Sequence, residues 1–270
     1  MEESRATWCG GEKGQGMDTF TASDGVEIAY YQWGHGSDRP LVVLHHGFIA
    51  NADANWVAPG IVDALLAAGR RVAAVDARGH GASGKPHDRA KYGEARMAQD
   101  LSMLLDILGE PQVDLVGYSM GAVVSLILAA KDTRIRRLVV GGVGAAAVEI
   151  GGVDRRVLNG PSVLEALTAD DPADITDQGA AAFRVFADAV GGDRFALAAQ
   201  AASMHRAPIA LEAITAPALV LAGDGDELAT RPEVLAGAIP GGSLRVVSGD
   251  HLGAVRDPDF AKAITEFLAG

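Results

Sequence analysis

A serine stands between two glycines in "GYSMG", residues 117–121, where two apolar segments meet without a polar linker. The run "QVDLVG" before it is typical of a buried strand, and residues 120–131 are typical of a helix. Gly-x-Ser-x-Gly at such a junction predicts a nucleophile elbow, a tight turn that presents the serine hydroxyl at the end of a sheet. Small residues on both sides avoid a clash between strand and helix. Ser119 is therefore the candidate nucleophile.

A serine hydroxyl needs a base within hydrogen-bonding reach, and the base needs an acid to orient it. In a parallel sheet these partners follow later strands, in the order serine, acid, histidine. His251 directly follows the strand-like run "SLRVVS", and no other histidine after Ser119 has such a position. Asp224 and Asp226 follow the strand-like run "ALVLAG", and Asp250 adjoins the histidine itself. We expect His251 to be the base.

Three aspartates compete for the role of the acid. Asp250 is disfavoured because neighbouring side chains on an extended turn diverge. Asp224 comes straight after Gly223, where the strand still ends, so its carboxylate should stay near the sheet edge. Asp226 has turned the corner and can reach the loop that carries His251. We therefore predict Asp226.

The reaction also needs backbone N–H donors for a developing oxyanion. Met120 follows the serine at the start of a helix and supplies one donor. Phe48, in "HHGF" after an early strand, supplies the other, because Gly47 lets the chain turn inward. The adjacent His45 and His46 are expected to be structural. They are not expected to share a metal ion, since neighbouring strand residues point to opposite faces.

Strand-like runs alternate with helical segments along most of the chain, which predicts an α/β fold: a doubly wound, mostly parallel sheet with helices on both faces. Residues 145–213 break this alternation. They contain no strand-like run and have helical spacing over 154–167, 176–190 and 193–204. We expect them to form an all-helical cap inserted between core segments 17–144 and 214–270. The predicted pocket-lining residues of the cap are Phe183, Phe186 and Met204.

Composition excludes several functional classes. The formal net charge is −12 and basic residues do not form a face, so we expect no nucleic-acid partner. No apolar stretch approaches the length of a membrane span. Residues 1–16 lack an apolar signal core and are interpreted as a flexible leader that holds the single cysteine, Cys9. One cysteine permits no disulfide framework and no thiolate metal site, and a cytoplasmic location is expected.

A dinucleotide site is also disfavoured. Gly142-x-Gly144-x-x-Ala147 follows a strand-like run, but Gly151 and Gly152 interrupt the helix that must follow, and no second strand with an acidic end comes after it. We expect neither a cofactor nor a metal ion.

Five segments, in this order, resemble the α/β-hydrolase fold superfamily, and the resemblance covers about residues 20–270. They are "HHGF" (45–48), "DARGHGASGKP" (76–86), "GYSMG" (117–121), "AGDGDEL" (222–228) and "GDHLGAV" (249–255). The resemblance implies that Asp76, Arg78 and His80 shape the fold and are not catalytic. Ala122 stands where some members have a further glycine.

The resemblance implies Ser119 as nucleophile, His251 as base, and the N–H groups of Phe48 and Met120 as oxyanion donors. Relatives tend to place the acid three residues after the glycine that ends the strand, which is Asp226. The implied activity is hydrolysis of a small-molecule ester or lactone through an acyl-enzyme. Hydrolysis of a carbon–carbon bond on the same triad is the main alternative, and a catalytically quiet ligand-binding member, a peptidase and a perhydrolase remain further alternatives. Dehalogenases and epoxide hydrolases are disfavoured because those enzymes use aspartate in place of the serine.

Overall fold

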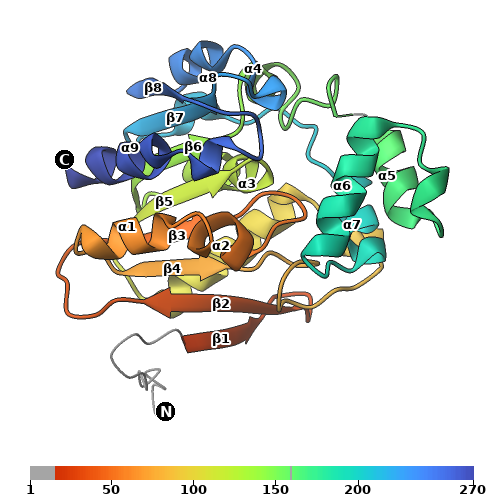
Figure 1. The fold of residues 1–270 in the computed structure, drawn as a ribbon. Coiled ribbons are helices and arrows are strands. Elements are labelled where there is room, and N and C mark those ends of the chain that lie inside the picture. The colour runs from red at the N-terminus through yellow and green to blue at the C-terminus, as the bar shows by residue number, and fades with distance from the viewer. Residues whose placement is uncertain (1–15, 159) are drawn as a thin grey trace.

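The computed structural model describes residues 16–158 and 160–270, which form an eight-stranded sheet with helices on both faces (Figure 1). The strand order is β1-β2-β4-β3-β5-β6-β7-β8. All neighbouring strands are parallel except in the pairs β1–β2 and β2–β4. The predicted mostly parallel, doubly wound sheet is confirmed. The strands are β1 (Gly16–Thr21), β2 (Glu27–Trp33), β3 (Leu41–His45), β4 (Val72–Val75), β5 (Val113–Tyr118), β6 (Ile135–Gly141), β7 (Ala218–Gly223) and β8 (Gly242–Val247).

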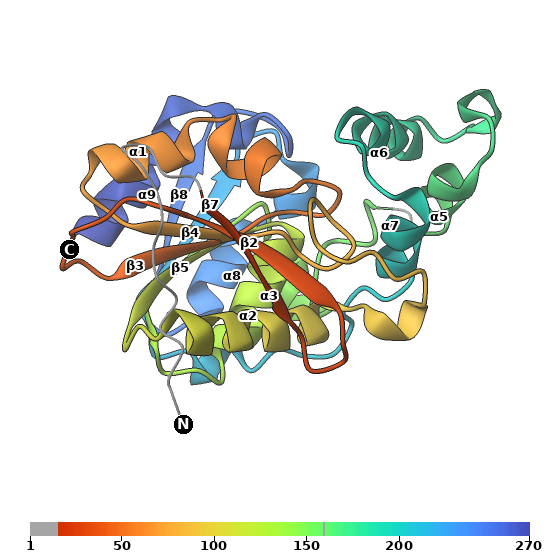
Figure 2. The ribbon, with the colours of Figure 1, turned by 90° about the horizontal axis from the view of Figure 1, so that it is seen from below.

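The helices α1 and α9 cover one face of the sheet, and α2, α3 and α8 cover the other (Figure 2). Each face has its own buried core. Leu104, Val123 and Leu235 belong to the first, and Leu65 and Phe260 belong to the second. The sheet therefore lies between two apolar layers, one on each face. The covering helices are α1 (Ile61–Ala67), α2 (Glu94–Leu108), α3 (Met120–Ala129), α8 (Pro232–Ala238) and α9 (Pro258–Ala269).

Within residues 145–213, the described part contains helices and turns but no strand. Figure 1 shows three helices of this segment to one side of the sheet, α5 (Gly160–Thr168), α6 (Gln178–Ala189) and α7 (Arg194–Ala201). The short helix α4 (Ala145–Glu149) lies beside α8. We call residues 145–213 the cap. None of the helices in the described ranges is long and apolar enough to cross a membrane.

The helices predicted over 176–190 and 193–204 lie close to those positions, as α6 and α7, whereas the short helix α4 was not predicted and one helix begins late. The helix expected from residue 154 begins only at Gly160. Asp154 instead organises a turn, because its Oδ1 accepts a hydrogen bond from the N–H of Arg156 and its carbonyl accepts one from the N–H of Leu158. Aspartate competes with helical hydrogen bonding in this way when it stands at the start of a segment.

Three other elements differ from expectation. The strand β1 was not predicted. It is mostly exposed and pairs only with β2, so no buried pattern marks it. Its first residue, Gly16, falls inside the predicted leader 1–16, and the rest of that leader lies outside the described residues. The helix expected over 56–69 divides at Gly60, which has φ 81°, into a π-helical turn (Asp53–Val57) and α1. Sequence analysis assigned no element to α8.

The junction of β5 and α3 is packed too tightly for any side chain on its two glycines. A Cβ on Gly121 would overlap the carbonyl oxygen of His45, and a Cβ on Gly117 would overlap the carbonyl oxygen of Gly121. Both obstacles are backbone atoms, which cannot move without shifting β3 or α3. The two glycines are therefore steric requirements of the turn.

We predict that Gly121→Ala lowers the free energy of unfolding by about 3 kcal/mol, because overpacking against backbone forces a main-chain shift. Urea unfolding followed by circular dichroism measures this loss. The matched control is Gly237→Ala in α8, where an added Cβ meets no atom. That change should stabilise the protein slightly, since alanine is the better helix former. Equal stabilities of the two variants would contradict the steric account.

Candidate active site

Ser119 occupies a strained turn at the carboxyl end of β5. Its φ of 54° and ψ of −114° lie in a region that residues with a side chain rarely adopt. Its N–H donates to the carbonyl of Gly141 at 2.8 Å, which holds the turn against the neighbouring strand β6. The chain then enters α3, whose residues are all buried. This conformation is the one expected of a nucleophile elbow.

The structure brings the serine, histidine and aspartate predicted from the sequence into one hydrogen-bonded line. The Ser119 Oγ lies 3.0 Å from His251 Nε2. His251 Nδ1 lies 2.9 Å from each carboxylate oxygen of Asp226. The Asp226 side chain is fully buried, whereas that of His251 is 18% exposed. The three residues follow β5, β7 and β8, so the parallel sheet positions them all at one edge.

The three candidate aspartates have different partners. Asp226 Oδ1 also accepts from the backbone N–H groups two and three residues further on, at 2.9 and 3.2 Å. Asp224 Oδ1 accepts from the N–H of Gly249 at 2.9 Å and so ties the β7 loop to the β8 loop. Asp250 Oδ1 accepts from N–H groups of its own turn. Of the three, only Asp226 is hydrogen-bonded to the imidazole of His251.

Tyr118 contacts both the backbone and the ring of His251, a role that was not predicted from the sequence. Its hydroxyl donates to the backbone carbonyl of His251 at 2.7 Å, and the two ring centroids lie 5.3 Å apart. Burial raises the pKa of Tyr118 well above its ordinary value, so the hydroxyl keeps its proton and remains a donor. Nothing in the sequence links these residues, which are brought together only by the packing of the loop after β8 over β5.

The loop after β3 lies beside the serine. A Cβ on Gly47 would come within 3.3 Å of the Ser119 Cβ. The N–H of Gly47 donates to the side chain of Asn55 at 2.8 Å, which fixes the loop. Within the described ranges, the N–H groups of Phe48 and Met120 have no protein acceptor. Both residues line the same cavity as Ser119. Two unpaired donors are thus available near the serine, as an oxyanion site requires.

His45 and His46 lie under this loop and take no part in the line of Ser119 and His251. The N–H of Ala77 donates to His46 Nε2 at 2.9 Å, and His46 Nδ1 in turn donates to the carbonyl of Gly47 at 2.7 Å. Burial lowers the pKa of His46 well below its ordinary value and that of His45 to about 4. Both rings are therefore neutral and hold the loop in place. No cluster of metal-binding side chains occurs in residues 16–158 or 160–270.

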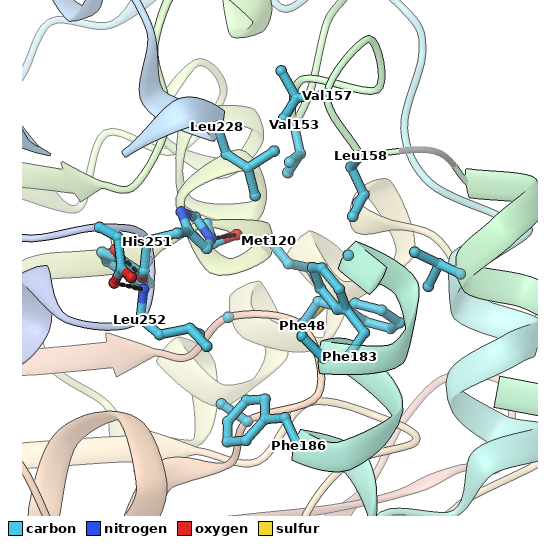
Figure 3. A pocket seen from close by; sticks show the side chains of 18 of the residues that line it. Phe48, Met120, Val153, Val157, Leu158, Phe183, Phe186, Leu228, His251 and Leu252 are labelled. Carbon is cyan, nitrogen blue, oxygen red and sulfur yellow. Dashed lines mark hydrogen bonds between the residues drawn. The ribbon is translucent and has the colours of Figure 1, made fainter. Parts of the chain in front are cut away.

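A cavity of about 720 Å³ opens between the core and the cap, with Ser119 and His251 in its wall. The cap residues predicted to line a pocket, Phe183, Phe186 and Met204, all line it. Figure 3 shows Phe183 beside Phe48, and their ring centroids lie 6.3 Å apart. Most of the remaining wall is apolar and includes Val153, Leu158, Val163, Leu228 and Val255.

Besides Asn55 and Ser119, two further buried polar residues line this cavity, Glu94 and Gln200. Burial raises the pKa of Glu94 to about 7, although its own N–H, that of His205 and the charge of Arg155 oppose the rise. Neither residue was predicted from the sequence. An acidic residue in the first turn of a helix is usually solvent-exposed, and only the position of the cap buries this one.

A family model described as "alpha/beta hydrolase fold" matches residues 40–149, which contain the loop after β3 and the turn at Ser119. The order of the strands and the helices on both faces of the sheet agree with that fold. The protein has the α/β-hydrolase fold.

Curated relatives match only part of their own length. A non-heme chloroperoxidase, CPO-A1, from Kitasatospora aureofaciens is 43% identical over 105 residues, which is 39% of this chain and 35% of the relative. A 2-hydroxy-6-oxo-2,4-heptadienoate hydrolase from Pseudomonas putida is 37% identical over 128 residues, 47% of this chain and 44% of the relative. The chain thus spans less than half of these relatives.

Solved structures match over nearly the full length. The crystal structure of a hydrolase from Pseudomonas aeruginosa PA01 is 27% identical, covers 94% of this chain and 98% of that one, and has a TM-score of 0.72. The likeness therefore includes the cap and the loops that carry Asp226 and His251.

The raised pKa of Glu94 predicts a pH-dependent stability. The folded carboxyl holds its proton up to about pH 7, whereas the unfolded one releases it near 4.5. The unfolded state therefore binds fewer protons between these values, and stability falls as the pH rises through this window. Relative to the isosteric Glu94→Gln variant, the wild type should lose about 3 kcal/mol of unfolding free energy across the window.

Urea unfolding of both proteins at pH values across this window measures the difference. Because the two side chains have the same shape, groups other than Glu94 cancel in the comparison. A difference that is constant with pH would contradict the account.

Proposed function

We propose that this protein is a serine hydrolase that cleaves a small-molecule carboxylic ester or lactone through an acyl-enzyme intermediate. One observation carries the proposal. Ser119 Oγ, His251 Nε2 and the Asp226 carboxylate form a continuous hydrogen-bonded line at the wall of an apolar cavity. Phe48 and Met120 line the same cavity, and their unpaired N–H groups further support the proposal.

In the proposed mechanism, His251 Nε2 takes the proton of the Ser119 hydroxyl while Oγ attacks the carbonyl carbon. Asp226, hydrogen-bonded to Nδ1, holds the required tautomer and stabilises the imidazolium. The N–H groups of Phe48 and Met120 donate to the oxyanion of the tetrahedral intermediate. As the intermediate collapses, the imidazolium returns its proton to the leaving alkoxide.

Deacylation repeats these steps with water as the nucleophile. His251 takes a proton from the water, which attacks the acyl carbon, and the proton then passes to Ser119 Oγ as the ester bond to the serine breaks. The products are a carboxylic acid and an alcohol, or one hydroxy acid from a lactone. Phe183, Phe186 and Met204 would contact the apolar parts of the substrate.

We also propose a cytoplasmic location, which rests on the single cysteine in the sequence.

Carbon–carbon bond hydrolysis is the second candidate, and the similarity to the Pseudomonas putida 2-hydroxy-6-oxo-2,4-heptadienoate hydrolase favours it. That name describes a substrate with a carboxylate group. Here the wall of the cavity includes the acidic residues Glu94, Asp177, Glu227 and Asp250. Arg256 is also part of that wall, but the acidic residues outnumber it, which favours a neutral ester.

Replacement of Ser119 by alanine tests the nucleophile. We predict that Ser119→Ala keeps the fold but lowers kcat for p-nitrophenyl esters by a factor of about 10⁴ to 10⁶, because the attacking atom is removed. A fluorophosphonate probe should label the wild type and not the variant. Activity of the variant within tenfold of wild type would refute the assignment, and absence of labelling in the wild type would favour a quiet ligand-binding protein.

The two loop aspartates provide a matched pair. We predict that Asp226→Asn lowers kcat about 10⁴-fold, because an asparagine favours the wrong tautomer of His251. Asp224→Asn should cost far less, since Asp224 binds the N–H of Gly249 and not the imidazole. Steady-state kinetics on the same ester compares them. The opposite order of rates would assign the acid to Asp224.

A further inference from the structure

Two of the buried polar side chains in the cavity wall, one from the core and one from the cap, lie where the cap adjoins the core. Glu94 is the first residue of α2, and Gln200 lies in α7. Both line the cavity that contains Ser119 and His251. Glu94 is 2% exposed and Gln200 is 0% exposed. Polar groups buried to this extent lower stability unless they are hydrogen-bonded, so their partners indicate what they do.

One oxygen of each side chain holds the cap against the core. Glu94 Oε2 accepts from the backbone N–H of His205 at 2.6 Å. Gln200 Oε1 accepts from the backbone N–H of Gly93 at 3.0 Å. Each bond joins residues of the cap to the start of α2. These two bonds explain why the side chains are fixed in place.

The amide nitrogen of Gln200, in contrast to its oxygen, has no such hydrogen bond. Its Nε2 is buried and has no hydrogen-bond partner among the residues the structure describes. An amide nitrogen carries two N–H donors, and leaving them unpaired costs free energy. Contact with the Gln200 side chain lowers the pKa of the Glu94 carboxyl, so the two groups adjoin, although their geometry does not make a full hydrogen bond. A donor and a carboxyl group therefore lie together in the wall of the cavity.

A hydroxyl group suits this pair better than other common substrate groups. Its oxygen accepts from the Gln200 amide while its hydrogen is donated to the Glu94 carboxylate. An ammonium group cannot accept from the amide, a carboxylate is repelled where Glu94 is ionised, and a methyl group leaves the N–H groups of the Gln200 amide unpaired. Where Glu94 holds a proton, its O–H can donate to the same hydroxyl oxygen.

We propose that Glu94 and Gln200 form a subsite for a hydroxyl group of the substrate. This deepens the proposed function and rests on it. The ester or lactone that the protein prefers then carries a hydroxyl away from the carbonyl that Ser119 attacks. The apolar part of the same cavity wall, which includes Phe183 and Met204, would contact the carbon chain that joins the hydroxyl to the carbonyl.

The experiment uses p-nitrophenyl esters in matched sets of three, whose acyl chains end in a methyl, a hydroxyl or an ammonium group, at several chain lengths. An apolar cavity alone favours the methyl ester, so the subsite predicts the opposite order. At the best length, wild-type kcat/KM for the hydroxyl ester should exceed that for the methyl ester by about 10- to 100-fold.

The variant Gln200→Met keeps the approximate length of the side chain and removes its hydrogen bonds. It should lower the hydroxyl-to-methyl ratio at least tenfold. The matched control is Met204→Leu, an apolar change in the same cavity, which should shift all three esters together and leave the ratio unchanged. Thermal unfolding checks that each variant is folded. If Gln200→Met does not fold, the wild-type series decides by itself.

Failure of the subsite and failure of the proposed function give different results. Hydrolysis that depends on Ser119 but shows no hydroxyl preference, or prefers the methyl or ammonium ester, overturns the subsite alone. A ratio unaffected by Gln200→Met does so too. If no ester is hydrolysed and Ser119 is not labelled, the proposed function fails. Calorimetric binding of the free hydroxy acids against the plain acids then tests the subsite separately, and equal affinities overturn it.

Discussion

The close approach of β5, α3 and the end of β3 is the constraint on which the rest of the site depends. No side chain fits at Gly117 or Gly121, because a Cβ at either position would overlap a backbone carbonyl oxygen. Between them Ser119 is held at a positive φ. Such strain persists only where the surroundings over-determine it. Here a fully buried α3 and the hydrogen bond to Gly141 supply that support.

This turn also explains the location of the proposed catalytic groups. Parallel strands end at one edge of the sheet, so the loops after β5, β7 and β8 converge there. The loop after β3 joins them because Gly47 packs against the serine. Each loop is held by hydrogen bonds other than those of the triad line, such as Asp224 to Gly249 and Asn55 to Gly47. The groups are thus pre-organised before a substrate binds.

The cap contributes the other half of the cavity and changes the chemistry of the core beneath it. Glu94 belongs to the core, yet its burial and raised pKa come with the packing of the cap segment that contains His205 over it. The apolar side chains of α6 complete the wall next to Phe48. In the proposed function, substrate selection therefore depends on how cap and core meet, whereas the line from Ser119 to Asp226 lies within the core.

The sequence by itself determined the features that depend on local pattern. Buried β-branched runs and glycine-flanked turns specified the parallel sheet, the turn at Ser119 and the helical character of residues 145–213. The order of Ser119, Asp226 and His251 along the chain was also sufficient to anticipate that they meet, because parallel strands bring their ends together. The late start of α5 and the division of the helix at Gly60 were not anticipated, since single turns depend on side-chain hydrogen bonds and backbone angles.

Only the tertiary structure decided which residues surround this line. The contact of Tyr118 with His251 joins residues far apart in the sequence, and so does the proximity of Glu94 and Gln200. Asn55 and Gly47 are only eight residues apart, but their hydrogen bond also depends on the conformation of the loop. Their partners are chosen by loop conformation and by the position of the cap, neither of which leaves a periodic signal. The strand β1 could not be predicted from the sequence, because this exposed edge strand buries too few side chains to show an apolar pattern.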